Sequence, residues 1–571
     1  MESSKAETRP NGGVLVAEAL GDAGVELVFS LNGGHVGPIY DACIDRRIRI
    51  VDVRHEEAAG HMAHAYSRVG RHMGVAVVSA GPGVTNIVTA VANAYQAGAP
   101  LLVIGGKAPL RQFEMGALQD IPQVEIMAPI TKWARTVLET RRIGEYVAEG
   151  LRRARSGRPG PVYLEIPTDV LRRDVEAGDV VPTAGCEVEG RSSGDPEVIA
   201  RAAELLRQAR RPLVVVGSGV GWSGAEQELA ALLDTTGFPV ITTSAAKGSV
   251  PADHPQLVAG ARSAALSGAD VVLVVGTRLN FVMGYGRPPR FAAGAKVVQI
   301  DIDPVELGRN RRVEVGIAAD ARMGLAQLTE ALADSSGPES GEWLDTLRDT
   351  DRTAREALDG MRRSDATPVH PLRLCAEVAR AVGEDGIVAA DGGDIFSFAR
   401  VGIDTYRPGH WLEPGVFGCL GVGVPFAVAA KIARPEQRVA CITGDGAFGL
   451  TGLELDTAVR HDVPIVVVIS NNAAWAIERA SQIRDYGPDR VIGTDLLPTR
   501  YDLMAQALGC HGELAERPEE LAPALERAFA SGRPACVNVM TDPNAVSPDS
   551  ARGLAVVPDD QPLGWRAGRV R

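Results

Sequence analysis

Two polar segments, each at the end of a predicted strand, carry residue types that bind metal ions and phosphates. Asp445 lies between Gly444 and Gly446, and Asn472 follows a second apolar strand further along the chain. A carboxylate and an amide oxygen are ligands that a hard cation such as Mg²⁺ accepts. Glycines on both sides of a carboxylate let the backbone approach a phosphate closely. The set therefore predicts a Mg²⁺ site that holds a diphosphate.

The elements around these residues place both segments at one edge of a parallel sheet. Residues 439–443 and 464–469 are apolar runs with the length of buried strands, and an amphipathic helix separates them. Strands joined in this way are parallel neighbours, and their carboxyl ends meet where open α/β sheets bind ligands. A tight turn at 444–446 followed by an asparagine cap would give the same pattern without a ligand.

The stretch 439–477 resembles the signature of thiamine diphosphate (ThDP) enzymes, in which Gly-Asp-Gly is followed by a paired asparagine. The resemblance implies that Mg²⁺ is coordinated by Asp445, Asn472 and the backbone carbonyl oxygen of Ala474. It also implies further cofactor contacts, at Gly444, Gly446, Ala447, Trp475 and Ile477.

Length and composition exclude several other classes of protein. The chain has 571 residues, for which the usual domain size predicts about three to four domains. A net charge of −13 leaves no electrostatic footprint for nucleic acid. No apolar run has transmembrane length and the first residues lack a signal sequence, so we expect a cytoplasmic protein without a membrane partner. The seven cysteines lack metal-binding spacing and are expected to be reduced.

The first part of the chain repeats the order of strand, polar loop and helix. Predicted strands lie at residues 27–29, 50–53, 74–79 and 100–105, and each ends in a polar or glycine-rich loop. This order predicts a doubly wound parallel sheet in an N-terminal domain of residues 1–183.

Glu56 follows the second of these strands, within R-H-E-E-A-A-G-H-M-A-H-A-Y-S-R. An isolated glutamate at a helix start would complement the helix dipole. The segment, however, resembles the one that carries the activating glutamate of ThDP enzymes. The resemblance implies that the Glu56 carboxylic acid lies in a dry pocket and bonds N1′ of the cofactor pyrimidine. The aminopyrimidine can then take the C2 proton of the thiazolium.

Two further loops of this domain are candidates for contact with the reacting atoms. His35 lies in N-G-G-H-V-G-P-I-Y-D-A, at a position where acetolactate synthases carry a small residue, and an imidazole there could touch substrate. Segment 116–123, G-A-L-Q-D-I-P-Q, resembles a loop of related enzymes that places Gln119 near the reacting carbon. Leu118 replaces an aromatic residue in that loop.

Residues 196–335 are predicted to form a central Rossmann-like domain after a polar linker. A G-x-G-x-x-G pattern at Gly219, Gly221 and Gly224 follows a strand there. The next strand, 239–243, ends without an acidic ribose-binding residue, so the pattern alone does not predict a dinucleotide site.

A longer run in this domain resembles 2-hydroxyacyl-CoA lyases and oxalyl-CoA decarboxylases, through A-R-S-A-A-L, T-R-L-N and G-R-P-P-R-F. In that branch the domain binds ADP and the adenosine end of CoA. The resemblance implies phosphate contacts for Arg262 and Arg278, and a ribose contact for Asp301 or Asp303. Both arginines fit ordinary surface or interface positions equally well. Acetolactate synthases bind FAD in this domain. Because the A-R-S-A-A-L run resembles the CoA-dependent branch, ADP is expected ahead of FAD.

The doubly wound pattern resumes at residues 366–543, a predicted diphosphate-binding domain. Segment 411–425 resembles the family segment in which a backbone carbonyl accepts from the 4′-amino group of the cofactor, here that of Gly418. Two residues on, an apolar side chain lies between the cofactor rings, here that of Leu420. Leu420 would otherwise be a core residue.

Charged residues after Asn472 and in the tail complete the candidates. Glu478 and Asp495 could line the substrate pocket or carry solvated surface charges. The tail, residues 544–571, is irregular and becomes basic. We expect it to be either disordered or a lid that closes Ser550 and Arg552 over CoA.

The sequence thus predicts an α/β protein of three doubly wound parallel-sheet domains with a C-terminal lid. In the superfamily it resembles, the glutamate and the diphosphate clamp come from different subunits, which implies a homodimer or homotetramer. The resemblance favours a lyase that converts a 2-hydroxyacyl-CoA to formyl-CoA and an aldehyde or ketone. An acetolactate synthase-like carboligase acting on pyruvate or other 2-oxo acids is second, and an oxalyl-CoA decarboxylase third. A non-catalytic protein that retains the fold would lack the glutamate or a metal ligand, and this chain has both.

Overall fold

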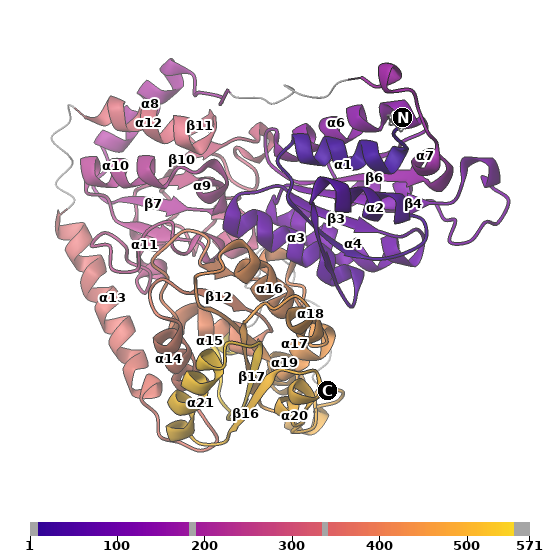
Figure 1. The fold of residues 1–571 in the computed structure, drawn as a ribbon. Coiled ribbons are helices and arrows are strands. Elements are labelled where there is room, and N and C mark those ends of the chain that lie inside the picture. Colours follow the sequence, from indigo (N-terminus) through magenta and orange to yellow (C-terminus); the bar gives the residue numbers. More distant parts are fainter. Residues whose placement is uncertain (1–8, 182–189, 334–340, 553–571) are drawn as a thin grey trace, which may run out of the picture.

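The computed structural model describes residues 9–181, 190–333 and 341–552. Over these residues the chain forms three separate parallel sheets, each with hydrophobic cores on its two faces. Figure 1 shows three adjoining units, with the first at the upper right, the second at the upper left and the third below. The predicted class, an α/β protein with three doubly wound sheets, is confirmed.

The first unit holds a six-stranded sheet in the order β2-β1-β3-β4-β6-β5, with every neighbouring pair parallel. Its central strands are continuous apolar runs because helices cover both faces of the sheet. The elements are α1 (Gly12–Asp22), β1 (Leu27–Leu31), α2 (Gly37–Arg46), β2 (Arg49–Asp52), α3 (Glu56–Gly70), β3 (Gly74–Val78), α4 (Pro82–Ala97), β4 (Leu101–Lys107), α5 (Gln123–Met127), β5 (Trp133–Thr136), α6 (Ile143–Arg155), β6 (Pro161–Pro167) and α7 (Thr168–Arg172).

The second unit holds a five-stranded sheet in the order β11-β10-β9-β7-β8. The G-x-G-x-x-G pattern opens the short helix that follows the first strand of this sheet. The elements are α8 (Pro196–Arg207), β7 (Pro212–Val216), α9 (Ser218–Ser223), α10 (Glu226–Thr236), β8 (Val240–Thr242), α11 (Arg262–Gly268), β9 (Val271–Val275), β10 (Lys296–Asp301), β11 (Val315–Ala318) and α12 (Ala321–Leu332).

The third unit holds six strands in the order β13-β12-β14-β15-β17-β16, which repeats the strand order of the first unit. Its elements are α13 (Gly341–Arg362), α14 (Pro371–Val382), β12 (Ile387–Ala390), α15 (Asp394–Gly402), β13 (Trp411–Leu412), α16 (Gly423–Ala433), β14 (Val439–Gly444), α17 (Asp445–Thr451), α18 (Glu454–Arg460), β15 (Val466–Asn471), α19 (Ala476–Tyr486), α20 (Tyr501–Ala507), β16 (His511–Ala515), α21 (Pro518–Ala530), β17 (Ala535–Met540) and α22 (Pro548–Arg552).

The first and third units share one hydrophobic core. Helices α3 and α16 pack against each other, and buried side chains such as Met62, Ile87 and Phe426 belong to the same cluster. The second unit has cores of its own on the two faces of its sheet. The position of α3 relative to the third sheet is therefore fixed by close packing.

Two further observations bear on the class of protein. Within the described ranges, no helix is long and apolar enough to cross a membrane. The six cysteines that the structure describes are free thiols, and all but Cys419 are buried.

Candidate active site

The residues predicted to form the metal clamp lie at the carboxyl edge of the third sheet. Strands β14 and β15 are parallel neighbours, so Asp445 and Asn472 follow adjacent strand ends. The side chain of Asp445 is buried, and burial raises the pKa of its carboxyl to about 6. Its Oδ2 atom has no hydrogen-bond partner among the described residues. A buried carboxylate oxygen without a partner is costly unless a cation neutralises it, so the site fits Mg²⁺.

The remaining ligands of such a cation must be neutral oxygens. In the part of the chain that the structure describes, no group of three or more His, Cys, Asp or Glu side chains could hold a metal. Ala474 is buried directly beside the clamp and Ala473 before it has a positive φ of 54°, which turns the backbone sharply. An amide oxygen and a backbone carbonyl are the donors that this edge offers.

Glycines keep space open around the clamp. A Cβ atom on Gly446 would lie 2.7 Å from the ring of Trp475, and one on Gly393 would lie 2.6 Å from the side chain of Ile477. Only glycine permits these two packings without movement of the neighbouring side chain. The ring of Trp475 and the side chain of Ile477 therefore lie directly against the edge where a diphosphate would bind.

Gly418 and Leu420 lie between β13 and α16, on the same edge. Gly418 has a φ of +70°, and the Leu420 side chain is partly exposed. The segment is held from behind by Asp391, whose carboxylate accepts from the backbone N–H of Gly392 at 2.6 Å and of Gly423 at 2.8 Å. Burial raises the pKa of Asp391 to about 6. This role of Asp391 could not be predicted from the sequence, since one of its two partners, Gly423, lies on a separate segment.

The first unit carries a second half-site. Glu56 begins α3 because His55 caps that helix, and the Glu56 carboxylate is buried and accepts from Nδ2 of Asn86 at 2.9 Å. Nδ1 of His35 lies 3.2 Å from Oγ of Ser79. Burial lowers the pKa of His35, so the ring is neutral at pH 7 and can accept a proton.

Gln119 belongs to the same half-site and has a strained backbone. Its φ is +62°, and a Cβ atom on Gly81 would lie 2.7 Å from the Gln119 side chain. Gly81 ends the short loop between β3 and α4, which begins at Ser79 beside His35, and Gly83 in the first turn of α4 lies next to Glu56. The structure therefore brings the three predicted residues of the first unit together around one loop.

A cavity of about 1830 Å³ extends between the three units. It is lined by Gly418, Leu420, the clamp with its neighbours Gly444, Gly446, Ala447, Trp475 and Ile477, and the central residues Arg262, Arg278 and Asp301. Among the described residues, Glu56, His35, Gln119, Asp303, Asp495 and Ser550 are not part of its lining. Glu56, His35 and Gln119 of one chain therefore lie outside the cavity that its own clamp residues line.

Arg262 is the most unusual side chain in the central part of this cavity. Its guanidinium donates to the carbonyl oxygen of Thr242 at 3.1 Å and contacts the sulfur of Met283 at 3.1 Å. Within the described residues it forms no ion pair, and burial lowers its pKa to about 10. A buried cation without an anion is costly, so this position fits an anionic ligand.

The other predicted nucleotide-binding residues differ in their surroundings. Arg278 donates to the backbone oxygen of Gln96 and so connects the second unit to the first. Asp301 is buried, and burial raises its pKa to about 6. Asp303 lies outside the cavity, where its carboxylate accepts from the N–H of Val305 and caps a short 3-10 turn.

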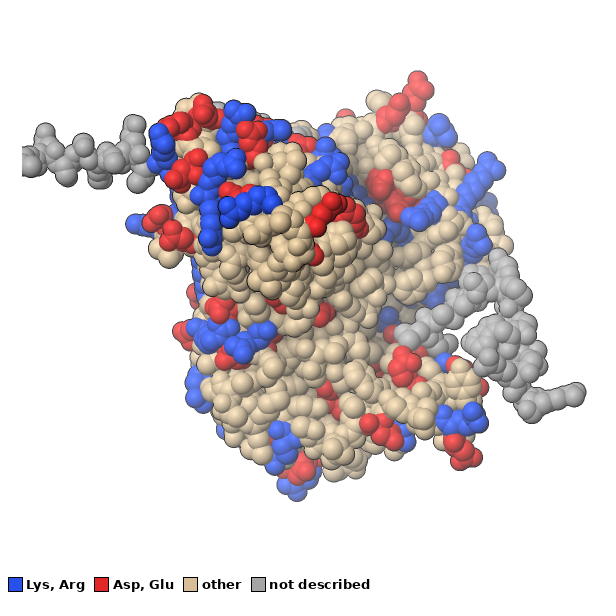
Figure 2. Space-filling view, turned by 90° about the vertical axis from the view of Figure 1, so that its right-hand side faces the viewer, with Lys and Arg blue, Asp and Glu red and all other residues tan. Residues whose placement is uncertain are grey.

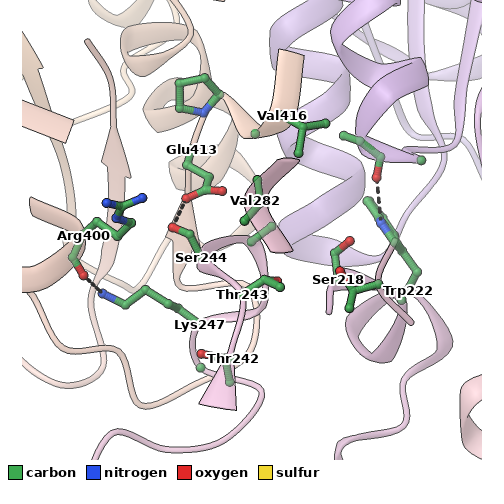
Figure 3. Close-up of a pocket in the computed structure, with 18 of the residues that line it drawn as sticks. Ser218, Trp222, Thr242, Thr243, Ser244, Lys247, Val282, Arg400, Glu413 and Val416 are labelled. Atoms are coloured by element: carbon green, nitrogen blue, oxygen red, sulfur yellow. Dashed lines mark hydrogen bonds between the residues drawn. The ribbon is translucent and has the colours of Figure 1, made fainter. Parts of the chain in front are cut away.

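A polar junction joins the second and third units at the cavity (Figure 3). Lys247 of the second unit donates to the carbonyl oxygen of Arg400 at 3.0 Å and lies 4.2 Å from the ring centre of Trp411. Burial lowers the pKa of Lys247 to about 8. Ser244 donates to the buried carboxylate of Glu413, as Figure 3 shows. The Trp411 indole donates to the same carboxylate oxygen. Glu413 could have been selected from the sequence, because it is the charged residue within the apolar run W-L-E-P-G-V-F-G.

The predicted substrate and tail residues lie near the clamp in different settings. Glu478 lines the cavity and is exposed, whereas the exposed Asp495 faces Arg479 at 3.5 Å outside it. Ser550 is buried and donates to Asp394 at 3.0 Å, so its hydroxyl is already used within the protein. Arg552 ends α22, but its side chain and the remainder of the expected lid lie outside the described residues.

A buried carboxylate that fits a cation at one sheet edge, and a buried glutamate at an equivalent edge, define an enzyme that binds a diphosphate cofactor. Models of the N-terminal TPP-binding, central and C-terminal TPP-binding domains of thiamine pyrophosphate enzymes match residues 10–126, 199–328 and 391–539. Over 541 residues the chain is 41% identical to the acetolactate synthase large subunit IlvG of Mycobacterium tuberculosis, covering 94% of this chain and 97% of that protein.

Two human proteins are also similar. The chain is 30% identical over 557 residues to 2-hydroxyacyl-CoA lyase 1 of Homo sapiens, covering 95% of this chain and 96% of that protein. It is 33% identical over 582 residues to 2-hydroxyacyl-CoA lyase 2 of the same organism, covering 94% and 90%. The chain belongs to the thiamine pyrophosphate enzyme family.

Proposed function

We propose that the protein is a ThDP- and Mg²⁺-dependent lyase that cleaves a 2-hydroxyacyl-CoA into formyl-CoA and an aldehyde or ketone. The observation that carries this proposal is the single cavity that joins the clamp to the central unit. A thioester of CoA needs such a path, because its nucleotide and its reacting carbonyl are far apart. Arg262, a buried cation without a carboxylate partner in the described chain, suits a phosphate at the far end.

The charged residues that line the cavity near the clamp favour a substrate whose reacting group is uncharged. Between Gly415 and Glu478, the charged lining residues that the structure describes are the acids Asp445 and Glu478, without a lysine or arginine. A carboligase that joins two 2-oxo acids must bind a carboxylate beside the cofactor. A thioester carbonyl carries no charge, so the acidic lining between residues 415 and 478 favours a thioester over a carboxylate.

Each site is proposed to form between two copies of the chain, as a homodimer or homotetramer. Glu56, His35 and Gln119 of one copy would face the clamp of the other, because they do not line the cavity of their own chain. The loop before Gln119 exposes Met115 by 74% and Leu118 by 78%. Figure 2 shows a broad area with few charged side chains on one face of the molecule. The exposed Met115 and Leu118 side chains, together with a face that carries few charges, fit burial against a second copy.

In the proposed reaction, ThDP would supply, when bound, a carbon nucleophile for the thioester carbonyl. Glu56 of the second copy holds a proton at N1′ of the pyrimidine, and Asn86 orients that carboxylate. His35, a neutral imidazole, accepts the proton of the substrate 2-hydroxyl as the C1–C2 bond breaks. The former C2 leaves as the carbonyl carbon of an aldehyde or ketone. A proton would then return to C1, and the bond between C1 and the cofactor would break, which releases formyl-CoA and restores the cofactor.

The protein's own side chains define what the other subsites would hold. Asp445, Asn472 and the Ala474 carbonyl would bind Mg²⁺, while Leu420 would separate the two cofactor rings. Arg278 and Asp301, which line the cavity in the central unit, are proposed to bind ADP.

A carboligase acting on pyruvate is the second candidate, and the 41% identity to a protein named as an acetolactate synthase large subunit favours it. Purified protein with ThDP and Mg²⁺ should release formyl-CoA from a 2-hydroxyacyl-CoA and form no acetolactate from pyruvate. The opposite pair of results would replace the lyase by the carboligase. Nucleotide released by denaturing the protein gives an independent readout, since ADP or CoA supports the lyase and FAD the carboligase.

A further inference from the structure

Helix α18 of the third unit holds the backbone that leads into Glu56. Oε1 of Glu454 accepts from the backbone N–H of Arg54 at 3.1 Å and of His55 at 3.1 Å. The other carboxylate oxygen accepts from Oγ1 of Thr457 at 2.6 Å. Glu454 is 1% exposed, and burial raises the pKa of its carboxyl to about 7, while the bonds from Thr457 and the two backbone N–H groups favour the charged form.

Exposed ion pairs surround this buried contact. Arg460 pairs with Asp52 and also donates to its carbonyl oxygen at 2.8 Å, while His461 lies 2.9 Å from the Asp52 carboxylate. Asp456 lies 3.8 Å from the Arg54 side chain. Exposed pairs of this kind contribute little to stability. Glu454 is therefore the contact on α18 that fixes the backbone at residues 54–55.

The chain order makes this contact relevant to the cofactor. Helix α17 begins with the clamp residue Asp445, and α18 follows it with Glu454 as its first residue. Glu56 comes directly after His55 and begins α3, which is anchored from behind by the core shared with α16. A shift of the peptide at residues 54–55 would therefore move the Glu56 carboxylate.

We propose that Glu454 is a positioning residue that sets the place of Glu56. The inference rests on the proposed role of Glu56 in a ThDP enzyme. In the proposed dimer, Asp445 belongs to the site of its own chain and Glu56 to the site of the second copy. Helices α17 and α18 therefore connect the metal-binding residues of one site to the activating glutamate of the other. A glutamine at position 454 could not replace the carboxylate, because its NH₂ group would stand where Oε2 accepts from Thr457 and, at 3.3 Å, from the N–H of Arg54, so a donor would face donors.

The test compares Glu454→Gln with Asp456→Asn, which removes one negative charge from the same helix without touching the backbone bonds. Deuterium exchange at C2 of bound ThDP, measured at saturating ThDP and Mg²⁺, should be about 10- to 100-fold slower in Glu454→Gln. It should stay within about 2-fold of wild type in Asp456→Asn. The kcat should fall in the same proportion as the exchange rate, with KM and oligomeric mass unchanged.

A second readout needs no cofactor. Amide hydrogen exchange of peptides covering residues 52–58 should lose protection in cofactor-free Glu454→Gln and keep it in Asp456→Asn. Wild-type C2 exchange or wild-type protection in Glu454→Gln would overturn the positioning role. If wild-type protein itself failed to accelerate C2 exchange over free ThDP, the proposed function would fall, while the amide readout would still decide the contact.

Should Glu454→Gln not fold, Thr457→Val decides in its place. This change keeps the carboxylate and removes one of its donors, so C2 exchange should slow by about 3-fold. An unchanged exchange rate in that variant would overturn the proposal.

Discussion

At the residue scale, the buried carboxylates of this protein differ in role because their oxygen atoms have different hydrogen-bond partners. Asp445 leaves one oxygen without a partner among the described residues, Asp391 gives its oxygens to backbone N–H groups, and Glu56 accepts from Asn86. The first suits a cation, the second holds a loop, and the third keeps an oxygen for a ligand. Burial is common to all three, so hydrogen-bond partners distinguish their roles.

Glu56→Gln tests the activating role directly. The amide keeps the shape of the side chain but cannot hold the acidic proton, so ThDP should bind while C2 exchange falls by roughly 10²- to 10⁴-fold. Isothermal titration gives the affinity, and NMR after acid quench gives the exchange rate. Exchange at the wild-type rate in this variant would remove Glu56 from the mechanism.

Gly446→Ala tests the close packing at the clamp. The new Cβ would lie 2.7 Å from the Trp475 ring, so the indole must move. We expect a loss of about 1–3 kcal/mol and weaker ThDP binding. Gly449→Ala is the matched control on the same helix, since a Cβ there meets nothing within 4 Å. Melting temperature and ThDP affinity measure both changes, and equal behaviour of the two variants would contradict the prediction.

At the element scale, the two sheets of identical strand order place their site residues at equivalent loops. Glu56 follows β2 and the Gly418 segment follows β13, which hold the same position in their sheets. The loop holding Gly81 follows β3, as Asp445 follows β14. Strand ends and loop positions of this kind follow from apolar runs and glycines, which is why these residues could be placed from the sequence.

Residues that act between distant segments could not be placed in that way. Lys247, Glu413 and Glu454 have partners that lie far away in the chain, and a single sequence contains no record of those contacts. Asp303 and Ser550 are at the expected loops, yet their oxygens are used by a turn and by Asp394. Local pattern predicts where a side chain is, and packing decides what it can still bind.

The junction at Lys247 predicts a dependence of stability on pH. The pKa of the Lys247 amine is about 8 in the folded protein and 10.5 in the ordinary state, so the unfolded chain holds more protons between these values. Stability relative to Lys247→Met should therefore rise as the pH increases from 8 to 10.5. Melting temperatures across this range check it, with Lys296→Met at an exposed lysine as the control for loss of one charge. A falling difference would contradict the assignment.

At the scale of the whole molecule, the separation of the two half-sites predicts complementation. Glu56→Gln and Asp445→Asn chains should each be inactive alone. Mixed dimers bring the intact Glu56 of one chain to the intact Asp445 of the other, so a statistical mixture should recover about one quarter of wild-type activity. Activity after refolding or co-expression of the two variants is the measurement. A mixture as inactive as its parents would place both residues in a site within one chain.

The core shared by the first and third units also has a consequence for synthesis. Helix α3 is made roughly 350 residues before α16, its packing partner. At ~5–20 residues per second, the apolar face of α3 stays uncovered for tens of seconds while the central unit is translated and folds. The nascent first unit is therefore most open to misassembly on that face, and a chaperone would cover it until residue 433 leaves the ribosome.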